Sequence, residues 1–183
     1  KQSVRHPIAI QEFRTPVYNV SLDDDVASHG ALPVILGDTL EMSAEAKYYA
    51  GGGLAGSPIK WDATLRQALY APPGWDRYSF KPARGRGHYW GYDEREEDHS
   101  VSVTQSSTLS GASTSAITFG ISALPRGEPS VLSVDATVTD VDRQTIRAAS
   151  RDIIVHASSY YIGIRPKPRT TDALELIVTD VDG

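Results

Sequence analysis

The chain has 183 residues, 40% of them hydrophobic, so it is long enough for one large domain or two small domains with buried cores. A formal net charge of −5 argues against nucleic-acid binding, which requires a basic face. The absence of cysteine excludes a disulfide scaffold, a thiolate nucleophile and a cysteine-ligated zinc site.

Two further sequence features bear on membranes and processing. No stretch approaches the roughly 18 consecutive apolar residues of a transmembrane helix. Residues 1–7 lack the apolar core of a signal peptide. The sequence ends at Gly183 in a pattern typical of a strand entering a turn. We therefore expect a fragment of a larger protein that makes no membrane contact through this segment.

Apolar residues at every second position predict half-buried β-strands along most of the chain. In chain order, this alternation covers residues 16–22, 40–46, 59–63 and 132–138. Two short apolar runs, residues 153–155 and 160–164, are typical of strands that are packed on both faces.

Residues 62–70 are the one place where a short helix competes with a strand. The alternation that starts at Ile59 would continue into this segment, so a strand is favoured, and Pro72, Pro73 and Gly74 end it. The predicted fold class is therefore all-β, with tandem antiparallel β-sandwich domains.

A weak internal repeat suggests how the domains are divided. Residues 45–52, 135–142 and 176–183 each read as an alternating strand that runs into a turn, and the first two segments begin 90 residues apart. This spacing suits one β-sandwich. The sequence thus predicts a last strand of a preceding domain at 1–13, one sandwich at 14–83, a second at 84–156, and opening strands of a following domain at 157–183.

Several motifs, taken in order, resemble the macroglobulin domains of the α2-macroglobulin and complement family, in particular its bacterial branch. The joint Glu12-Phe13-Arg14-Thr15-Pro16 resembles the passage between two such domains. The strand and hairpin at 37–57, the segment Tyr70-Ala71-Pro72-Pro73-Gly74-Trp75, and the strands at 136–145 and 154–157 are similar to later parts of the family pattern. The resemblance extends over nearly the whole chain and implies β-sandwich domains of macroglobulin or fibronectin III-like type.

This resemblance implies a structural segment upstream of the bait region of a broad-spectrum endopeptidase inhibitor, which traps proteases after they cut the bait. The family thioester joins a cysteine to a glutamine, so this cysteine-free chain departs from the pattern. The implied partners are neighbouring macroglobulin domains of the parent, and target proteases only through the full-length protein. The implied location is the periplasm, with a lipid-anchored parent.

Two acidic clusters are candidate cation sites. The run from Asp93 to His99 is the densest in charge, but its spacing matches no calcium-binding loop. The carboxylates Asp23, Asp24 and Asp25, with His29 nearby, point alternately to opposite sides on an extended strand. The prediction for both is a solvated segment that protects a sheet edge, with no metal site and no cofactor.

A hydrolytic constellation would need His88, His99 or His156 to meet Asp140 or Asp142. No Gly-x-Ser-x-Gly nucleophile elbow is present. The expectation is that the protein is not an enzyme and has no catalytic residues.

Binding through aromatic residues is the main alternative function. The run from Arg84 to Tyr92 interleaves basic and aromatic residues, as in some RNA-binding or sugar-binding surfaces. An adhesion or carbohydrate-binding module of immunoglobulin or fibronectin type would expose Trp61, Trp75, Trp90 and Tyr92, whereas a structural module would bury them. The sequon at Asn19 lies in a predicted strand and is discounted as a glycosylation site.

Overall fold

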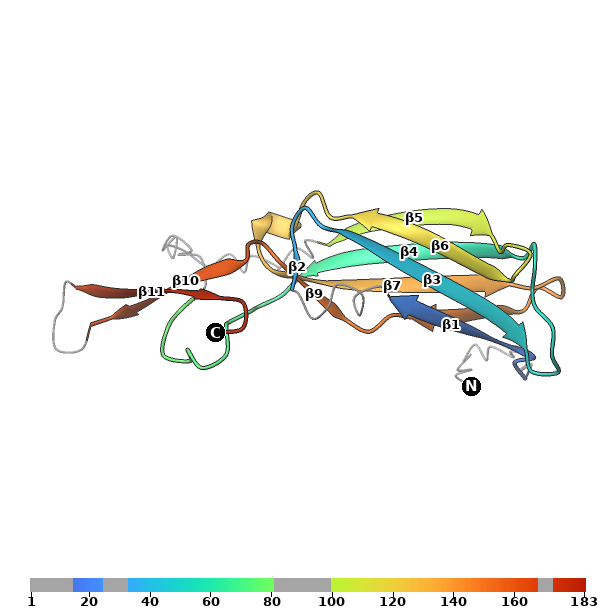
Figure 1. Ribbon diagram of the computed structural model, residues 1–183, viewed down its shortest axis with the longest axis horizontal. Helices are drawn as coiled ribbons and strands as arrows, with labels where there is room; N and C mark the ends of the chain where they lie inside the picture. The colour runs from blue at the N-terminus through green and yellow to red at the C-terminus, as the bar shows by residue number, and fades with distance from the viewer. Residues whose placement is uncertain (1–14, 25–32, 81–99, 168–172) are drawn as a thin grey trace, which may run out of the picture.

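The computed structural model describes residues 15–24, 33–80, 100–167 and 173–183 (Figure 1). These residues form strands joined by turns, with no α-helix among them and one 3-10 turn, η2 (Pro125–Gly127). The strands are β1 (Tyr18–Asp24), β2 (Val34–Ile35), β3 (Thr39–Tyr48), β4 (Pro58–Gln67), β5 (Val101–Thr108), β6 (Thr114–Gly120), β7 (Ser130–Thr139), β8 (Thr145–Ala149), β9 (Ile153–His156), β10 (Tyr160–Pro166) and β11 (Leu174–Asp180). The all-β prediction is confirmed. In the ambiguous segment 62–70, residues 62–67 are strand rather than helix, whereas residues 68–70 lie beyond the end of β4.

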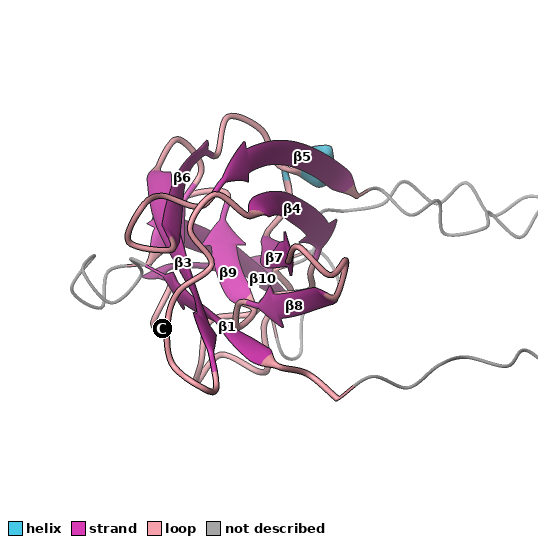
Figure 2. Cartoon of the chain, turned by 90° about the vertical axis from the view of Figure 1, so that its right-hand side faces the viewer, coloured by secondary structure: helices cyan, strands magenta, loops and turns pink. Residues whose placement is uncertain are grey.

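Two sheets face each other across one core (Figure 2). The first has the order β1-β3-β6, and the second has the order β2-β9-β7-β4-β5, with β8 also paired to β7. β4 pairs along one edge of β7, and the other edge of β7 is shared by β9 and β8. Apart from the short parallel pair of β2 and β9, the pairing is antiparallel.

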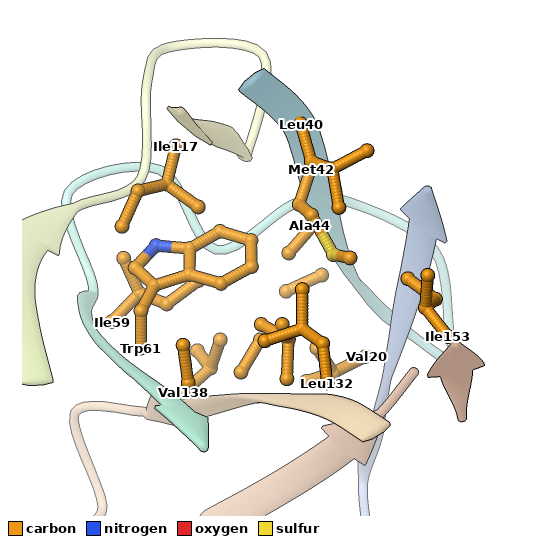
Figure 3. Close-up of a cluster of buried hydrophobic side chains, with 14 of the residues drawn as sticks. Val20, Leu40, Met42, Ala44, Ile59, Trp61, Ile117, Leu132, Val138 and Ile153 are labelled. Atoms are coloured by element: carbon orange, nitrogen blue, oxygen red, sulfur yellow. The ribbon is translucent and has the colours of Figure 1, made fainter. Parts of the chain in front are cut away.

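The alternation seen in the sequence puts every second side chain of β3, β4 and β7 into the core, because successive residues of a strand point to opposite faces. Figure 3 shows the Trp61 ring in the middle of this cluster. The buried side chains of these three strands include Leu40, Met42, Ala44, Ile59, Trp61, Ala63, Leu132, Val134, Ala136 and Val138.

Tyr18 ties the two sheets together. Its ring is fully buried on β1, and its hydroxyl lies 2.7 Å from the Val138 carbonyl oxygen and 2.8 Å from that of Gln144. Burial raises the pKa of Tyr18 to about 12, so the hydroxyl keeps its proton and shares this one donor between the two carbonyl oxygens.

The strand pairing overturns the predicted boundary between residues 83 and 84. β4 lies before that boundary, yet it pairs with β5 and β7, which lie after it. β3 likewise pairs with β6. Residues on both sides share one hydrophobic cluster, so described residues 18–156 form one sandwich and not two. The internal repeat at 45–52 and 135–142 gave the wrong number of sandwiches, because β3 and β7 are similar strands in opposite sheets of the same sandwich.

β10 and β11 form a separate antiparallel hairpin that extends from one end of the sandwich (Figure 1). One face carries Tyr160, Ile162, Leu174, Leu176 and Val178, which are all more than half exposed. The other face of the hairpin and one edge of β10 contact residues 68–80, the segment that directly follows β4, which we call the crossover segment. The predicted last strand at 1–13 lies outside the described residues.

Candidate functional site

Four rings join the sandwich to the hairpin, and we call them the aromatic junction: Tyr70 and Phe80 of the crossover segment, His156 at the end of β9, and Tyr161 of β10. The Tyr70 ring lies edge-on to His156, with centroids 4.6 Å apart, and 5.3 Å from the Tyr161 ring. Phe80 packs edge-on against Tyr161 at 6.4 Å. Aromatic pairs in this geometry stabilise contacts beyond their buried area.

Hydrogen bonds fix the orientation of these rings. His156 Nδ1 and the Tyr161 hydroxyl share a hydrogen bond of 2.8 Å, and the Tyr70 hydroxyl donates to the Val181 carbonyl oxygen after β11. Burial lowers the pKa of His156, with Asp182 opposing the shift, so the imidazole is neutral near pH 7. Burial raises the pKa of Tyr161 to about 12. The junction is therefore uncharged and held by rings and neutral hydrogen bonds.

Farther along the hairpin, a small polar cluster adds a second contact between the crossover segment and the hairpin. Arg165 of β10 contacts Glu175 of β11 at 2.8 Å and lies over the Tyr78 ring, 4.6 Å from its centroid. The Tyr78 hydroxyl donates to Glu175 at 2.9 Å. This hydrogen bond, together with Arg165, lowers the pKa of Glu175. The crossover segment is thus bound to both strands of the hairpin.

Gly163 allows the crossover segment to lie close to β10. A Cβ atom at this position would come within 2.7 Å of the Phe80 ring and 2.9 Å of Ile177, closer than real Cβ contacts. The Ser79 backbone pairs with Ile164 through hydrogen bonds of 2.8 and 3.0 Å. A glycine here has a packing role, because it makes room for Phe80.

At the end of the sandwich opposite the hairpin, the β7–β8 turn lies near the start of β1 (Figure 1). Gln144 of this turn holds the segment that leads into β1. Its Oε1 accepts from the Val17 N–H at 3.1 Å, and its Nε2 donates to the Thr15 carbonyl oxygen at 3.1 Å. The Gln144 backbone is itself fixed in the β7–β8 turn, where its N–H donates to Asp140 at 2.9 Å. The Gln144 side chain thereby pairs with the backbone of residues 15–17 as an adjacent β-strand would, and it fixes the direction of this segment.

The described parts of the predicted sites do not converge. His156 lies in the aromatic junction, whereas Asp140 caps the β7–β8 turn at the other end of the sandwich. Asp23 lies on β1, and Asn19 is an exposed residue of the same strand. Within the described ranges, no group of three or more histidine or acidic residues is arranged to hold a metal ion. The remaining candidates lie outside the described residues: Asp25, His29, His88, His99, the run from Arg84 to Tyr92 and the run from Asp93 to His99.

The tryptophans bear on the alternative function. Trp61 is 1% exposed in the core, so it cannot serve as a ligand platform. Trp75 is half-buried and packs edge-on against Tyr78 at 5.6 Å. Trp90 and Tyr92 lie outside the described residues. In addition, no helix among the described residues is long and apolar enough to cross a membrane.

Sequence reasoning singled out neither Gln144 nor the aromatic junction as a unit. The cluster of aromatic residues at 70–80 and 160–161 was a usable signal, because Tyr70, Phe80 and Tyr161 meet there. Gln144 carries no sequence signal, since a glutamine beside a turn is ordinary.

Comparison with known proteins assigns this architecture to a class. The chain aligns with solved structures of the native α2-macroglobulin of Escherichia coli (TM-score 0.60, 13% identity, 94% of this chain and 11% of that one) and of Salmonella α2-macroglobulin reacted with methylamine (TM-score 0.60, 14% identity, 94% and 12%). In fold it is therefore a macroglobulin-type β-sandwich protein.

A curated relative is similar to the chain in sequence as well. The chain is 28% identical over 183 residues to an α2-macroglobulin homolog of Nostoc sp., covering 95% of this chain and 9% of that protein. The resemblance to the bacterial α2-macroglobulin family is confirmed. No family model matches the sequence. The chain spans about a tenth of the length of these relatives.

Proposed function

We propose that the chain is a structural segment of a bacterial α2-macroglobulin-like endopeptidase inhibitor that traps proteases after its bait region is cleaved. The observation that carries the proposal is a sandwich with a closed core whose leading and departing chain segments are both held by specific contacts. Gln144 holds residues 15–17, and the aromatic junction holds the hairpin. A segment of this kind keeps the domains on either side of it in fixed directions.

The β10–β11 hairpin, within residues 157–183, supplies the opening strands of a following sandwich. Its exposed face carries five large apolar side chains, and Ile162 lies directly opposite Val178. A two-stranded hairpin is marginally stable by itself, and an exposed apolar sheet face is stabilised by a second sheet packed against it. The partner of this face is a neighbouring macroglobulin domain of the same parent chain.

The proposed activity, partners and location of the segment are those expected for a part of the full-length inhibitor. The segment is not an enzyme, binds no cofactor and meets target proteases only through the full-length protein. The parent acts in the periplasm, anchored by a lipid. Support for a framework role comes from the buried Trp61 and from the separation of His156 and Asp140.

A protease assay tests the proposal. The isolated chain, in tenfold molar excess over trypsin, is expected to leave cleavage of both a small peptide substrate and a folded protein substrate unchanged. The full-length parent is expected to suppress cleavage of the protein substrate. Stoichiometric inhibition by the isolated chain, or a parent that does not protect the protein substrate, contradicts the proposal.

A further inference from the structure

Three exposed apolar side chains lie at the end of the sandwich where the chain leads into β1, and we call them the N-terminal patch: Val17 before β1, Tyr49 after β3, and Val141 in the β7–β8 turn. They are 49%, 69% and 87% exposed. This end of the sandwich faces the viewer in Figure 2. Single exposed apolar residues are common on protein surfaces, but several in one place indicate a contact surface.

Backbone hydrogen bonds make the three segments of the N-terminal patch neighbours. The Tyr49 N–H donates to the Val17 carbonyl oxygen at 3.0 Å. The Val17 N–H donates to the side chain of Gln144, which belongs to the same turn as Val141. The Val17 backbone is therefore joined both to the loop after β3 and to the β7–β8 turn, so the patch is one region of the surface.

The β7–β8 turn holds Val141 in a fixed backbone. The Asp140 N–H donates to the Gln144 carbonyl oxygen at 3.0 Å, and the Arg143 N–H donates to the Asp140 carbonyl oxygen at 3.1 Å. The Gln144 N–H donates to the Asp140 carboxylate at 2.9 Å. Tight turns favour polar residues and glycine, so a valine between Asp140 and Asp142 is unusual. An apolar side chain presented by such an ordered turn enters a contact at little entropic cost.

The loop after β3 and the β5–β6 turn form the rest of this end. A Cβ atom at Gly53 would collide with the Ser113 Oγ, so the loop and the turn are in close contact. Between them lies a hollow of about 340 Å³, lined by Lys47, Tyr48 and residues 51–53 and 111–113. This end therefore combines apolar side chains with polar groups, which is typical of interfaces between domains of one chain.

The path of the chain indicates which domain this end faces. The β10–β11 hairpin extends from the opposite end of the sandwich, so a domain that follows the hairpin lies away from the N-terminal patch (Figure 1). The sequence predicts the last strand of a preceding domain at 1–13, which leaves residues 14–17 as the linker to β1. Two domains joined by so short a linker meet at an effective concentration in the millimolar range, so a modest contact area is sufficient.

We propose that the N-terminal patch is the docking surface for the β-sandwich domain that precedes this one in the parent chain. The proposal rests on the proposed function, which supplies that domain. Tyr49 and Val141 pack against apolar side chains of the preceding domain, and the exposed charges of Asp142 and Arg143 lie at the rim of the contact. Gln144 sets the angle between the two domains by fixing residues 15–17.

Hydroxyl-radical footprinting, read by mass spectrometry, compares the full-length parent with the isolated chain. We expect Tyr49 to be oxidised at least about fivefold more slowly in the parent, because the preceding domain covers its ring. Val103 on β5 is 54% exposed and lies outside the patch, so its oxidation rate is expected to be the same in both proteins.

Matched variants of the parent locate the contact. Val141→Lys changes a side chain that is 87% exposed, so folding of the sandwich is not at risk, but it places a charge in the interface. It is expected to raise the oxidation rate of Tyr49 at least about twofold. Thr118→Lys, at an exposed position on β6 outside the patch, is expected to leave that rate unchanged.

Equal oxidation of Tyr49 in the parent and in the isolated chain overturns the proposal, as does slowing of Val103 to the same extent or an unchanged rate in Val141→Lys. Protection of Tyr49 that grows with the concentration of the isolated chain assigns the patch to a second copy and also overturns it. The protease assay on the same parent separates the two proposals. A parent that protects the protein substrate while Tyr49 stays reactive contradicts the docking surface alone, whereas a parent with a covered Tyr49 and no protection contradicts the proposed function alone.

Discussion

Replacing Trp61 with alanine is expected to lower the free energy of unfolding by about 4 kcal/mol, the range found for large aromatic side chains removed from cores. Trp61 is 1% exposed at the centre of β4, which is paired on both edges, and its ring fills the space between the sheets (Figure 3). Domains typically have a total stability of only about 5–15 kcal/mol. Equilibrium urea unfolding, followed by circular dichroism, measures the loss.

Two matched variants make this prediction specific. Trp75→Ala removes a half-buried ring whose partner is Tyr78, and it is expected to cost about 1 kcal/mol. Trp61→Phe is expected to cost less than Trp61→Ala, because it keeps much of the ring and removes an Nε1–H that has no acceptor among the described residues. Equal losses for Trp61→Ala and Trp75→Ala would mean that Trp61 is not the core of the sandwich.

Separating the chain at the predicted domain boundary is expected to abolish folding. A fragment of residues 14–83 keeps β4 but loses both of its neighbours, β5 and β7. A fragment of residues 84–156 keeps β7 but loses β4, and it keeps β6 without β3. Each fragment would expose one side of the shared core, so neither buries enough apolar surface to offset its conformational entropy.

The measurement is far-ultraviolet circular dichroism of each fragment with a denaturant titration. We expect no cooperative transition from either fragment and a single transition from the intact chain. A cooperative transition from an isolated fragment would restore the two-sandwich interpretation that the sequence suggested.

The strands were predictable because their physical cause is local. On β3, β4 and β7 the alternation of side chains is visible in the sequence, and the same alternation fills the core. The turn after β7 was visible as well, since Asp140 precedes it and its carboxylate accepts from the Gln144 N–H.

The number of sandwiches was not predictable, because it depends on which strands pair. β3 and β7 have similar patterns, and nothing local says that they belong to opposite sheets of one core. The contacts that hold residues 15–17 and the hairpin against the sandwich also join residues far apart in the sequence. Gln144 reaches the Val17 N–H across 127 positions, and Tyr70 reaches Val181 across 111. Such partners become neighbours only after the sheets have formed.

The aromatic junction is expected to hold the hairpin in one direction relative to the sandwich. The cysteine-free chain can carry two spin labels at engineered cysteines, Ser106→Cys on β5 and Val178→Cys on β11, and both positions are exposed. Pulsed electron paramagnetic resonance then gives the distribution of distances between the labels. A single narrow distribution is predicted, and a broad or multi-peaked distribution would mean that the junction does not fix the hairpin on the sandwich.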